Sequence, residues 1–264
     1  MQQLMIGKYI PGNSLIHRLD PRAKLSIVFF YVFLVFLANN SASYGLLLLY
    51  SVLPVVFSGV PFRYILRGLK PMLWIFLFTF LLHVFTTKEG ALLFEFGPIS
   101  VHQKGLQQGT YMSIRFLVII LLTTLLTLTT TPIEITDGLE SLLSPFKRIG
   151  LPAHEIALMM SISLRFIPTL LEETEKIMKA QASRGVDFAG GPIRERLRAM
   201  VALLVPLFIS AFKRAEDLAI AMEARGYQGG GGRTKFRQLL WHVRDSAAFG
   251  SLLLTAFILV WIRS

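Results

Sequence analysis

The sequence predicts an all-α integral membrane protein with about five transmembrane helices and a set of amphipathic helices that are cytoplasmic or interfacial. Two of these amphipathic helices are expected to be long and to cross each other. The first observation is composition: 53% of the 264 residues are apolar and the mean hydropathy is +0.58, whereas soluble domains are less apolar and more charged. The second is that the charged residues cluster, which leaves long apolar runs between them. The third is that two long helical patterns end in the same short sequence.

The N-terminal membrane region, residues 1–130, is predicted to contain four spans. Asp20 before Pro21 is a favourable N-cap with proline at the first helical position, and it precedes the first span. The first two apolar runs are shorter than the roughly 20 residues usual for a span, so one buried hairpin is an alternative to two spans. A small β-hairpin is predicted near 94–101. The four predicted spans cover residues 25–38, 44–60, 71–85 and 111–130.

Lysine and arginine are unevenly distributed along the chain. Residues 1–24, 61–70 and 131–246 hold 23 of the 27, and the positive-inside rule places these segments in the cytoplasm. The N-terminus is therefore predicted to be cytoplasmic and the C-terminus external, in a multi-pass protein of the cell (plasma or inner) membrane. Because the basic excess follows this orientation and no DNA- or RNA-binding motif is present, no nucleic acid partner is expected.

The segment 131–246 is predicted to be a cytoplasmic helical region, and residues 247–264 are predicted to hold the last transmembrane helix. The segment begins with Thr131-Pro132-Ile133-Glu134, which is a capping box with proline at the first helical position. Gly229–Gly232 is expected to be a flexible linker between the last cytoplasmic helix and the final span.

The two long helices of this segment carry apolar residues at helical spacing. The first is predicted to begin near Ala153 and the second to end at Arg225. The stretch 200–212 of the second helix is interpreted as partly embedded in the membrane. Ordinary helix packing is expected to account for most residues of the two stripes. The stripes are Ile156, Met160, Leu164, Ile167, Leu171 and Met178 in the first helix, and Leu204, Phe208, Ala211, Ala215, Leu218 and Met222 in the second.

Small residues and prolines mark where these two helices are expected to cross. Ala211, Ala215 and Ala219 are spaced by four residues, which permits close approach of another helix. Pro168 is expected to bend the first helix, and Pro206 interrupts the second. These five residues are the candidates for the helix crossing or for the interface with a membrane partner.

Both long helices end in arginine followed by glycine. Glycine just after a helix adopts the left-handed conformation of a C-cap, and arginine complements the helix dipole. A single such ending is ordinary helix termination. Because the ending occurs twice in one polar segment, the sequence indicates two prongs whose planar guanidinium groups bind carboxylate and carbonyl oxygens. The candidate residues are Ala182, Ser183, Arg184 and Gly185 in the first copy, and Ala224, Arg225 and Gly226 in the second.

The sequence carries no pattern for catalysis or for cofactor binding. There is no cysteine and no phosphate-binding loop, so thiol chemistry and the usual mode of ATP binding are excluded. His154-Glu155 begins like a zinc-protease motif, but Leu158 stands where the second histidine is needed. His83 lies in a span without an acidic partner in any span, so a hydrogen bond in packing is favoured over function. No catalytic residue, metal site or cofactor is predicted.

The chain resembles the transmembrane (T) component of energy-coupling factor transporters. The resemblance covers nearly the whole length and rests on three patterns. These are His17-Arg18-Leu19-Asp20-Pro21-Arg22, Thr131-Pro132-Ile133-Glu134 and the two Arg-Gly helix ends. The motif of that family is Ala-Arg-Gly, occurring twice, and the first copy here has Ser183 in place of alanine.

The resemblance implies a non-enzymatic subunit of an importer. Its partners would be two ATP-binding-cassette ATPase subunits, a substrate-binding membrane protein (the S component) and the lipid bilayer. The two long helices would be coupling helices, with Arg184 and Arg225 each in a groove of one ATPase. The five crossing candidates would face either each other or the S component. The substrates implied are vitamins and related micronutrients, or metal cations, selected by the S component.

Two other functional classes remain open at this stage. A self-sufficient secondary transporter of small solutes is disfavoured because the spans hold no aspartate, glutamate or lysine of the kind that coupled transporters use at the midplane. An intramembrane enzyme is disfavoured because no catalytic constellation is visible.

Overall fold

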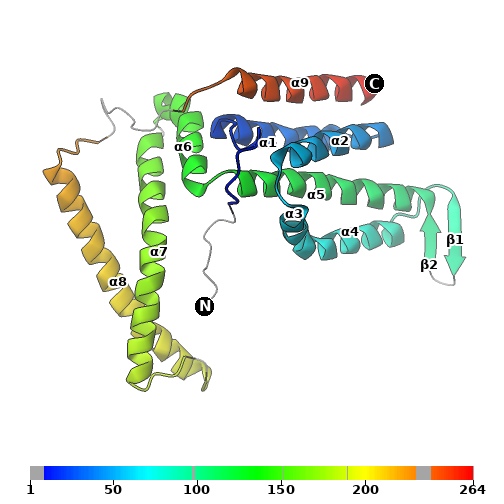
Figure 1. Ribbon diagram of the computed structural model, residues 1–264. Coiled ribbons are helices and arrows are strands. Elements are labelled where there is room, and N and C mark those ends of the chain that lie inside the picture. Colours follow the sequence, from blue (N-terminus) through cyan, green and yellow to red (C-terminus); the bar gives the residue numbers. More distant parts are fainter. Residues whose placement is uncertain (1–8, 97–98, 151, 189, 230–238, 264) are drawn as a thin grey trace. The chain divides into compact units, whose positions relative to one another are not determined.

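The computed structural model describes residues 9–96, 99–150, 152–188, 190–229 and 239–263 (Figure 1). The chain divides into two compact units, and each is described by itself. Residues 1–142 together with 238–264 form the bundle unit, and residues 143–237 form the two-helix unit. The predicted cytoplasmic region begins at residue 131, whereas the bundle unit extends to residue 142 and includes nearly all of the first helix of that region.

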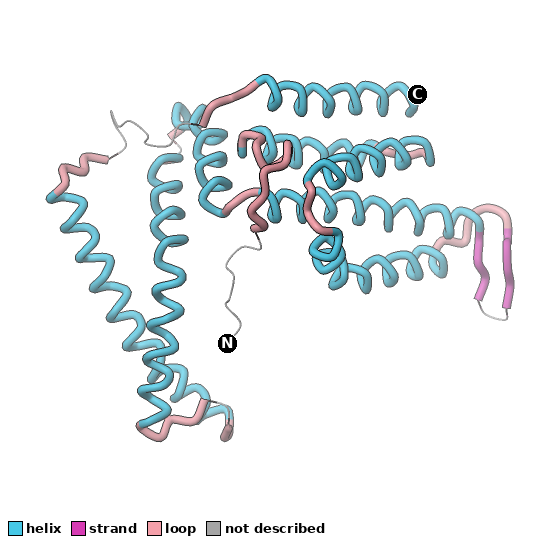
Figure 2. Tube along the Cα trace, viewed as in Figure 1, coloured by secondary structure: helices cyan, strands magenta, loops and turns pink. Residues whose placement is uncertain are grey.

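The bundle unit consists of helices and one short hairpin (Figure 2). Its first helix begins directly after Asp20, whose side chain accepts a hydrogen bond from the Arg22 amide at 2.8 Å, as predicted for this N-cap. The elements are α1 (Pro21–Leu37), α2 (Ser41–Ser58), α3 (Phe62–Leu69), a 3₁₀ turn (Lys70–Met72), α4 (Leu73–Thr86), β1 (Leu92–Phe96), β2 (Ile99–His102), α5 (Gln103–Thr129), α6 (Pro132–Leu143) and α9 (Val243–Arg263).

Helix α5 is the centre of the bundle unit, because it packs against α1, α2, α3 and α4, while α9 packs against α1 and α2. Tyr31 is fully buried, and its hydroxyl donates to the carbonyl of Leu47 at 2.8 Å, so the polar end of this core residue is satisfied. The main core is formed by Tyr31, Val35, Ala38, Tyr44, Leu47, Val118, Leu122, Leu125, Leu252 and Leu259.

The predicted hairpin and capping box are both present. Strands β1 and β2 pair antiparallel over the region predicted near 94–101. The Thr131 amide donates to Glu134 Oε2 at 3.1 Å, and the Glu134 amide donates to Thr131 Oγ1 at 3.3 Å. This reciprocal pair is the predicted capping box at the start of α6. Two residues separate the end of α5 from the start of α6.

Within the described residues, five helical stretches are long and apolar enough to cross a membrane. The number agrees with the prediction, but the set differs. Helix α1 has 17 residues, too short by this measure for the span predicted at 25–38. The stretch Ala153–Ser183, which lies in the region predicted to be cytoplasmic, is among the five instead. The five stretches are Ser41–Ser58, Phe62–Thr86, Gln103–Thr129, Ala153–Ser183 and Val243–Arg263.

The two-helix unit contains a 3₁₀ turn (Ser144–Ile149), α7 (Ala153–Ser183) and α8 (Ile193–Ala224). Both long helices were predicted, and 200–212 is an internal part of α8. Pro168 and Pro206 lie inside α7 and α8 respectively. Of the predicted linker, only Gly229 belongs to the described residues.

Ordinary helix packing was predicted to account for most stripe residues, and six of the twelve are half-buried while the other six are exposed. Among the described residues of α7 and α8, only Ala153, Ala157 and Ala199 are buried. Large stripe residues such as Met160 and Phe208 are exposed, Phe208 to 60%. Within the two-helix unit, α7 and α8 therefore leave a wide apolar surface exposed.

Candidate coupling site at two helix ends

The end of α7 is closed by backbone hydrogen bonds alone. Arg184 has φ −90° and ψ 8°, and Gly185 has φ 86°. The Gly185 amide donates to the Ala182 carbonyl at 3.0 Å, and the Val186 amide donates to the Gln181 carbonyl at 3.1 Å. This pair of bonds is a Schellman motif, which satisfies carbonyls that a helix end otherwise leaves free.

The end of α8 repeats this geometry. Arg225 has φ −88° and ψ 8°, and Gly226 has φ 77°. The Gly226 amide donates to the Glu223 carbonyl at 2.9 Å, and the Tyr227 amide donates to the Met222 carbonyl at 3.0 Å. The two predicted endings therefore have the same backbone structure as well as the same sequence pattern.

The glycines are required by the backbone conformation and not by crowding. A Cβ atom built on Gly185 or on Gly226 meets no heavy atom within 4 Å, so only the positive φ disfavours another residue there. All seven candidate residues at the two helix ends are exposed. Because the backbone closes each helix end, the side chains of Arg184 and Arg225 are not needed as caps.

Two polar contacts between α7 and α8 were not predicted from the sequence. Arg214 Nη2 lies 2.8 Å from Glu173 Oε2, and Gln181 Nε2 donates to the Ala202 carbonyl at 3.2 Å. Glu173 and Arg214 are 41 residues apart, the same offset that separates the two arginines of the helix ends. The repeat offset could therefore have identified this pair, because equivalent positions of the repeat contact each other.

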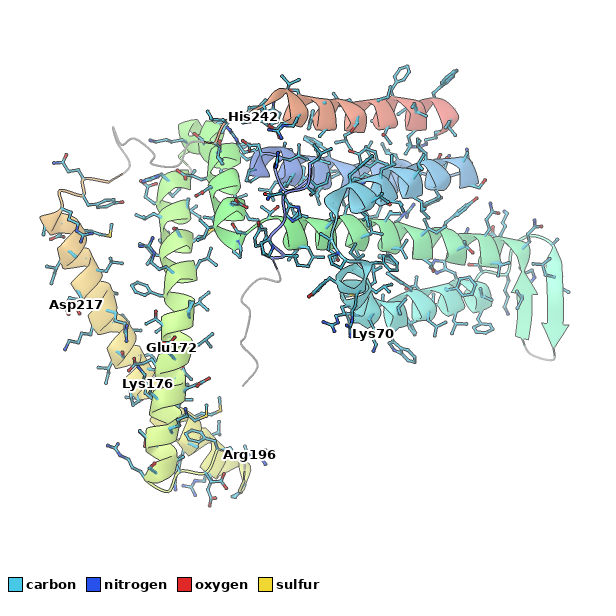
Figure 3. All side chains as sticks on the ribbon, in the orientation of Figure 1. Lys70, Glu172, Lys176, Arg196, Asp217 and His242 are labelled. Atoms are coloured by element: carbon cyan, nitrogen blue, oxygen red, sulfur yellow. The ribbon has the colours of Figure 1, made fainter. Side chains whose placement is uncertain are left out.

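Figure 3 shows α7 and α8 with charged side chains along their lengths, including Glu172 and Lys176 on α7 and Asp217 on α8. On α7, Glu175 Oε2 and Lys179 Nζ form an i,i+4 pair 4.0 Å apart, and both side chains are exposed. Such a pair contributes only a few tenths of a kcal/mol, about 0.2–0.5.

Two cavities lie between α7 and α8. The first, of about 320 Å³, is lined by Ala211, Ala215 and Ala219 together with residues of α7 such as Phe166. The three alanines therefore lie where α8 meets α7, while Pro168 is exposed and Pro206 is half-buried.

The second cavity, of about 580 Å³, is lined by residues near the end of α8 and by part of α7. Arg225 and Tyr227 lie on its wall together with Arg165 of α7. The second helix end thus combines an exposed arginine with a cavity lined by both apolar and polar residues.

No group of three or more histidine, cysteine, aspartate or glutamate side chains that could hold a metal ion occurs among the described residues. His83 makes the hydrogen bond in packing that was favoured for it: its Nδ1 donates to the Thr79 carbonyl at 2.9 Å, one turn earlier in α4.

Comparisons with known proteins identify relatives that match this chain over most or all of its length. The profile of the family described as "Cobalt transport protein", CbiQ, matches residues 12–236. The energy-coupling factor transporter transmembrane protein EcfT of Bacillus subtilis (strain 168) is 60% identical over 264 residues, covering 100% of both chains. The EcfT protein of Listeria innocua serovar 6a is 55% identical over the same length with the same coverage. That of Streptococcus thermophilus (strain ATCC BAA-250 / LMG 18311) is 48% identical over 264 residues, again covering 100% of both chains.

A match over most of the chain, with full-length relatives of this similarity, assigns the family. The helical architecture and the candidate spans agree with a multi-pass transport protein of the membrane. The chain belongs to the CbiQ family of transport proteins and is a transmembrane component of the energy-coupling factor type.

Proposed function

We propose that the chain is the coupling subunit of an energy-coupling factor importer. It transmits movements of two ATP-binding-cassette ATPase subunits to a substrate-binding S component that takes up a vitamin or a metal ion. The observation that carries this proposal is the pair of identical helix ends, each presenting an exposed arginine that the cap itself does not use.

Each arginine is proposed to enter a groove of one ATPase subunit. The guanidinium offers five donors in a planar fork, which suits carboxylate and carbonyl oxygens. An arginine buried against such partners costs about 2–5 kcal/mol when truncated, because the partner groups are left unpaired. Its interaction with the helix dipole alone contributes about 0.3–1 kcal/mol. The two roles therefore predict effects of different size.

The S component is proposed to cover apolar surface of the two-helix unit. On α8, Phe208, Ile209 and Phe212 are exposed to 60%, 65% and 72%. An exposed apolar surface of this kind is favourable only against lipid or another protein. On the same helix, Ala211, Ala215 and Ala219 line a cavity shared with α7.

The first experiment compares Arg184→Ala and Arg225→Ala with Arg194→Ala, a matched exposed arginine in the first turn of α8. The complex is purified through the tagged chain, and ATPase content, ATP hydrolysis and uptake are measured. Both helix-end variants should insert normally but lose ATPase subunits or transport, and the double variant should lose more. Arg194→Ala should behave like the parent.

Arginine-to-lysine changes at the two helix ends separate charge from geometry. Lysine keeps the charge but loses the planar fork, so Arg184→Lys and Arg225→Lys should restore assembly poorly. If both alanine variants assemble and transport like the parent, the arginines have no coupling role and the proposal is wrong.

The alternative of a self-sufficient transporter is tested with the chain purified alone in lipid vesicles. As a coupling subunit it should neither hydrolyse ATP nor accumulate a vitamin such as riboflavin. Both activities should appear when the ATPase subunits and a riboflavin-binding S component are added. Uptake by the chain alone would instead support the secondary transporter.

We further propose that the N-terminus lies in the cytoplasm, because the positive-inside rule assigns the segments rich in lysine and arginine to that side. The chain contains no cysteine, so single cysteines can be labelled without background. Ser41→Cys, which is exposed at the start of α2, should react with an impermeant reagent from outside, and Ser144→Cys only from the cytoplasm. Ser43 is fully buried and unsuitable for labelling. External labelling at position 144 would overturn the orientation.

A further inference from the structure

The chain passes between the two units twice. Arg22 of the bundle unit contacts a segment next to each of these two points. The first passage follows residue 142 and the second precedes residue 238. Arg22 Nη1 donates to Ser141 Oγ at 3.3 Å, and Arg22 Nη2 donates to the Leu239 carbonyl at 2.8 Å. One guanidinium thus contacts the last turn of α6 and the segment that leads into α9.

Arg22 is held in place by Asp20. Arg22 Nε and Nη2 donate to the two carboxylate oxygens of Asp20 at 3.1 Å and 3.0 Å, and the Asp20 side chain is only 2% exposed. The same carboxylate also caps α1 through the Arg22 amide. A bidentate pair of this kind fixes the plane of the guanidinium, so its other N–H groups point in set directions.

Asp245 extends this contact to the first turn of α9. It is 1% exposed, and its carboxylate accepts from the Asp20 amide and from the His242 amide, both at 2.7 Å. The start of α9 is therefore joined to the start of α1 by charge-assisted hydrogen bonds inside the protein, where they are screened little by water.

Helix α6 is also packed tightly against the start of α1. A Cβ atom built on Gly138 would lie 3.0 Å from Leu25 Cδ1 and 3.2 Å from Pro21 Cβ. A larger residue at this position would therefore require the side chain of Leu25 or the start of α1 at Pro21 to shift by a few tenths of an ångström. The Arg22–Ser141 bond lies one turn further along α6, so packing and hydrogen bonding fix the same end of the helix.

We infer that Arg22, oriented by Asp20, is a positioning residue that clamps the last turn of α6 and the segment before α9 to the start of α1. Movement that reaches the last turn of α6 is then passed to the starts of α1 and α9, because these segments are joined by hydrogen bonds. Without Arg22, the last turn of α6 and the segment before α9 lose their shared contact with the start of α1. This inference rests on the proposed coupling function, and it assigns a role to the Asp20-Pro21-Arg22 part of the N-terminal motif.

The direct test compares Arg22→Gln with Arg18→Gln, an exposed arginine of the same motif. The full complex is reconstituted with a riboflavin-binding S component, and labelled riboflavin uptake is divided by ATP hydrolysed. Arg22→Gln should keep the ATPase subunits and hydrolysis but lower this ratio about tenfold, as expected when hydrogen bonds from a charged group are lost. Arg18→Gln should leave the ratio unchanged.

Two further variants keep the test informative if Arg22→Gln folds poorly. Ser141→Ala removes one bond and keeps the Asp20–Arg22 pair, so the ratio should fall less than in Arg22→Gln. Arg22→Lys keeps the charge, but one amine cannot replace the fork, so the ratio should also fall. An unchanged ratio in both Ser141→Ala and Arg22→Lys would overturn the inference.

A covalent tether tests the mechanical role separately from the chemistry of arginine. Ser141→Cys and Leu239→Cys are introduced together with Arg22→Gln, and the two thiols are bridged by a short bis-methanethiosulfonate, which forms a disulfide with each thiol and releases methanesulfinate. The bridge should restore uptake per ATP, and reductive cleavage should abolish the recovery. If the bridged complex stays as uncoupled as the unbridged one, the clamp is not what Arg22 supplies.

Failure of this inference can be told apart from failure of the proposed function. If the parent complex takes up riboflavin with ATP while the Arg22 variants do so equally well, only the clamp is wrong. If the parent chain binds no ATPase subunits, the proposed function is wrong as well.

Discussion

The bundle unit and the two-helix unit differ in how much of each is buried in an interior of its own. In the bundle unit, buried polar groups such as Asp20, Lys24 and Asp245 have their hydrogen-bond partners inside the protein. In the two-helix unit, the buried residues among the described parts of α7 and α8 are three alanines, Ala153, Ala157 and Ala199. The bundle unit therefore has an interior with large side chains and a polar network, whereas the two-helix unit buries only small residues in the described parts of its long helices.

One chain can therefore combine a rigid part, the bundle unit, with a part that adjusts to its partners, the two-helix unit. A satisfied polar network in a dry interior rigidifies the elements that it joins. Helices with few buried contacts open locally at low free-energy cost and can adjust to a partner. Mutations should accordingly have large effects on stability in the bundle and small effects in the two-helix unit, where binding is the sensitive measurement.

The largest effect on stability is expected from Asp245→Ala. The change leaves the buried Asp20 amide and the part-buried His242 amide without their charged acceptor, which should cost about 2–4 kcal/mol. Thermal unfolding in detergent would show it as a clear drop in Tm. Asp217→Ala, at an exposed position of α8, is the matched change in the other unit and should stay within about 0.5 kcal/mol. Equal effects of the two changes would contradict the comparison of the units.

An intermediate effect is expected from alanine at the helix-end glycines. Gly185→Ala and Gly226→Ala should each cost about 1–2 kcal/mol, because both glycines have positive φ. The two costs should be equal, since neither site is crowded. Hydrogen exchange of the last turns of α7 and α8 is the measurement, because this unit unfolds locally.

Gly250→Ala provides a control of opposite sign for these two changes. Gly250 lies within α9, and its added Cβ meets no atom within 4 Å. Alanine should therefore stabilise the helix by roughly 0.5–1 kcal/mol. Destabilisation at all three glycines would show that φ is not the deciding factor.

The smallest effect is expected from Glu173→Gln. Its ion pair with Arg214 is short at 2.8 Å, but both side chains are partly exposed, at 24% and 37%. Water screens such a pair, so its loss should cost about 1 kcal/mol or less. A double-mutant cycle with Arg214→Gln isolates the pair, and a coupling energy well above that value would mean that the two-helix unit has a specific interior of its own.

Local chemistry could be read from the sequence, and long-range contacts could not. The cap at Asp20, the capping box at Thr131 and both helix ends depend on residues a few positions apart, and all were predicted correctly. The bond between the Asp20 amide and Asp245 joins residues 225 positions apart, so no local pattern contains it.

The burial of the long helices could not be predicted for a related reason. Apolar periodicity at positions such as Met160 and Phe208 shows that one face of a helix prefers an apolar environment. It does not say whether another helix of the same chain, a partner or lipid supplies that environment. The different set of candidate spans has another cause, because α1 has 17 residues and is too short, whereas the 31-residue α7 contains a sufficiently apolar stretch.

The pairing of Glu173 with Arg214 has a consequence for assembly. Equivalent positions of a repeat touch each other when a local two-fold axis passes between the two copies, and such an axis also interchanges the two helix ends. A partner made of two similar halves could then accept the pair of helices in either of two orientations. Side-chain differences between the copies, such as Ser183 against Ala224, are what would make the two orientations unequal in free energy.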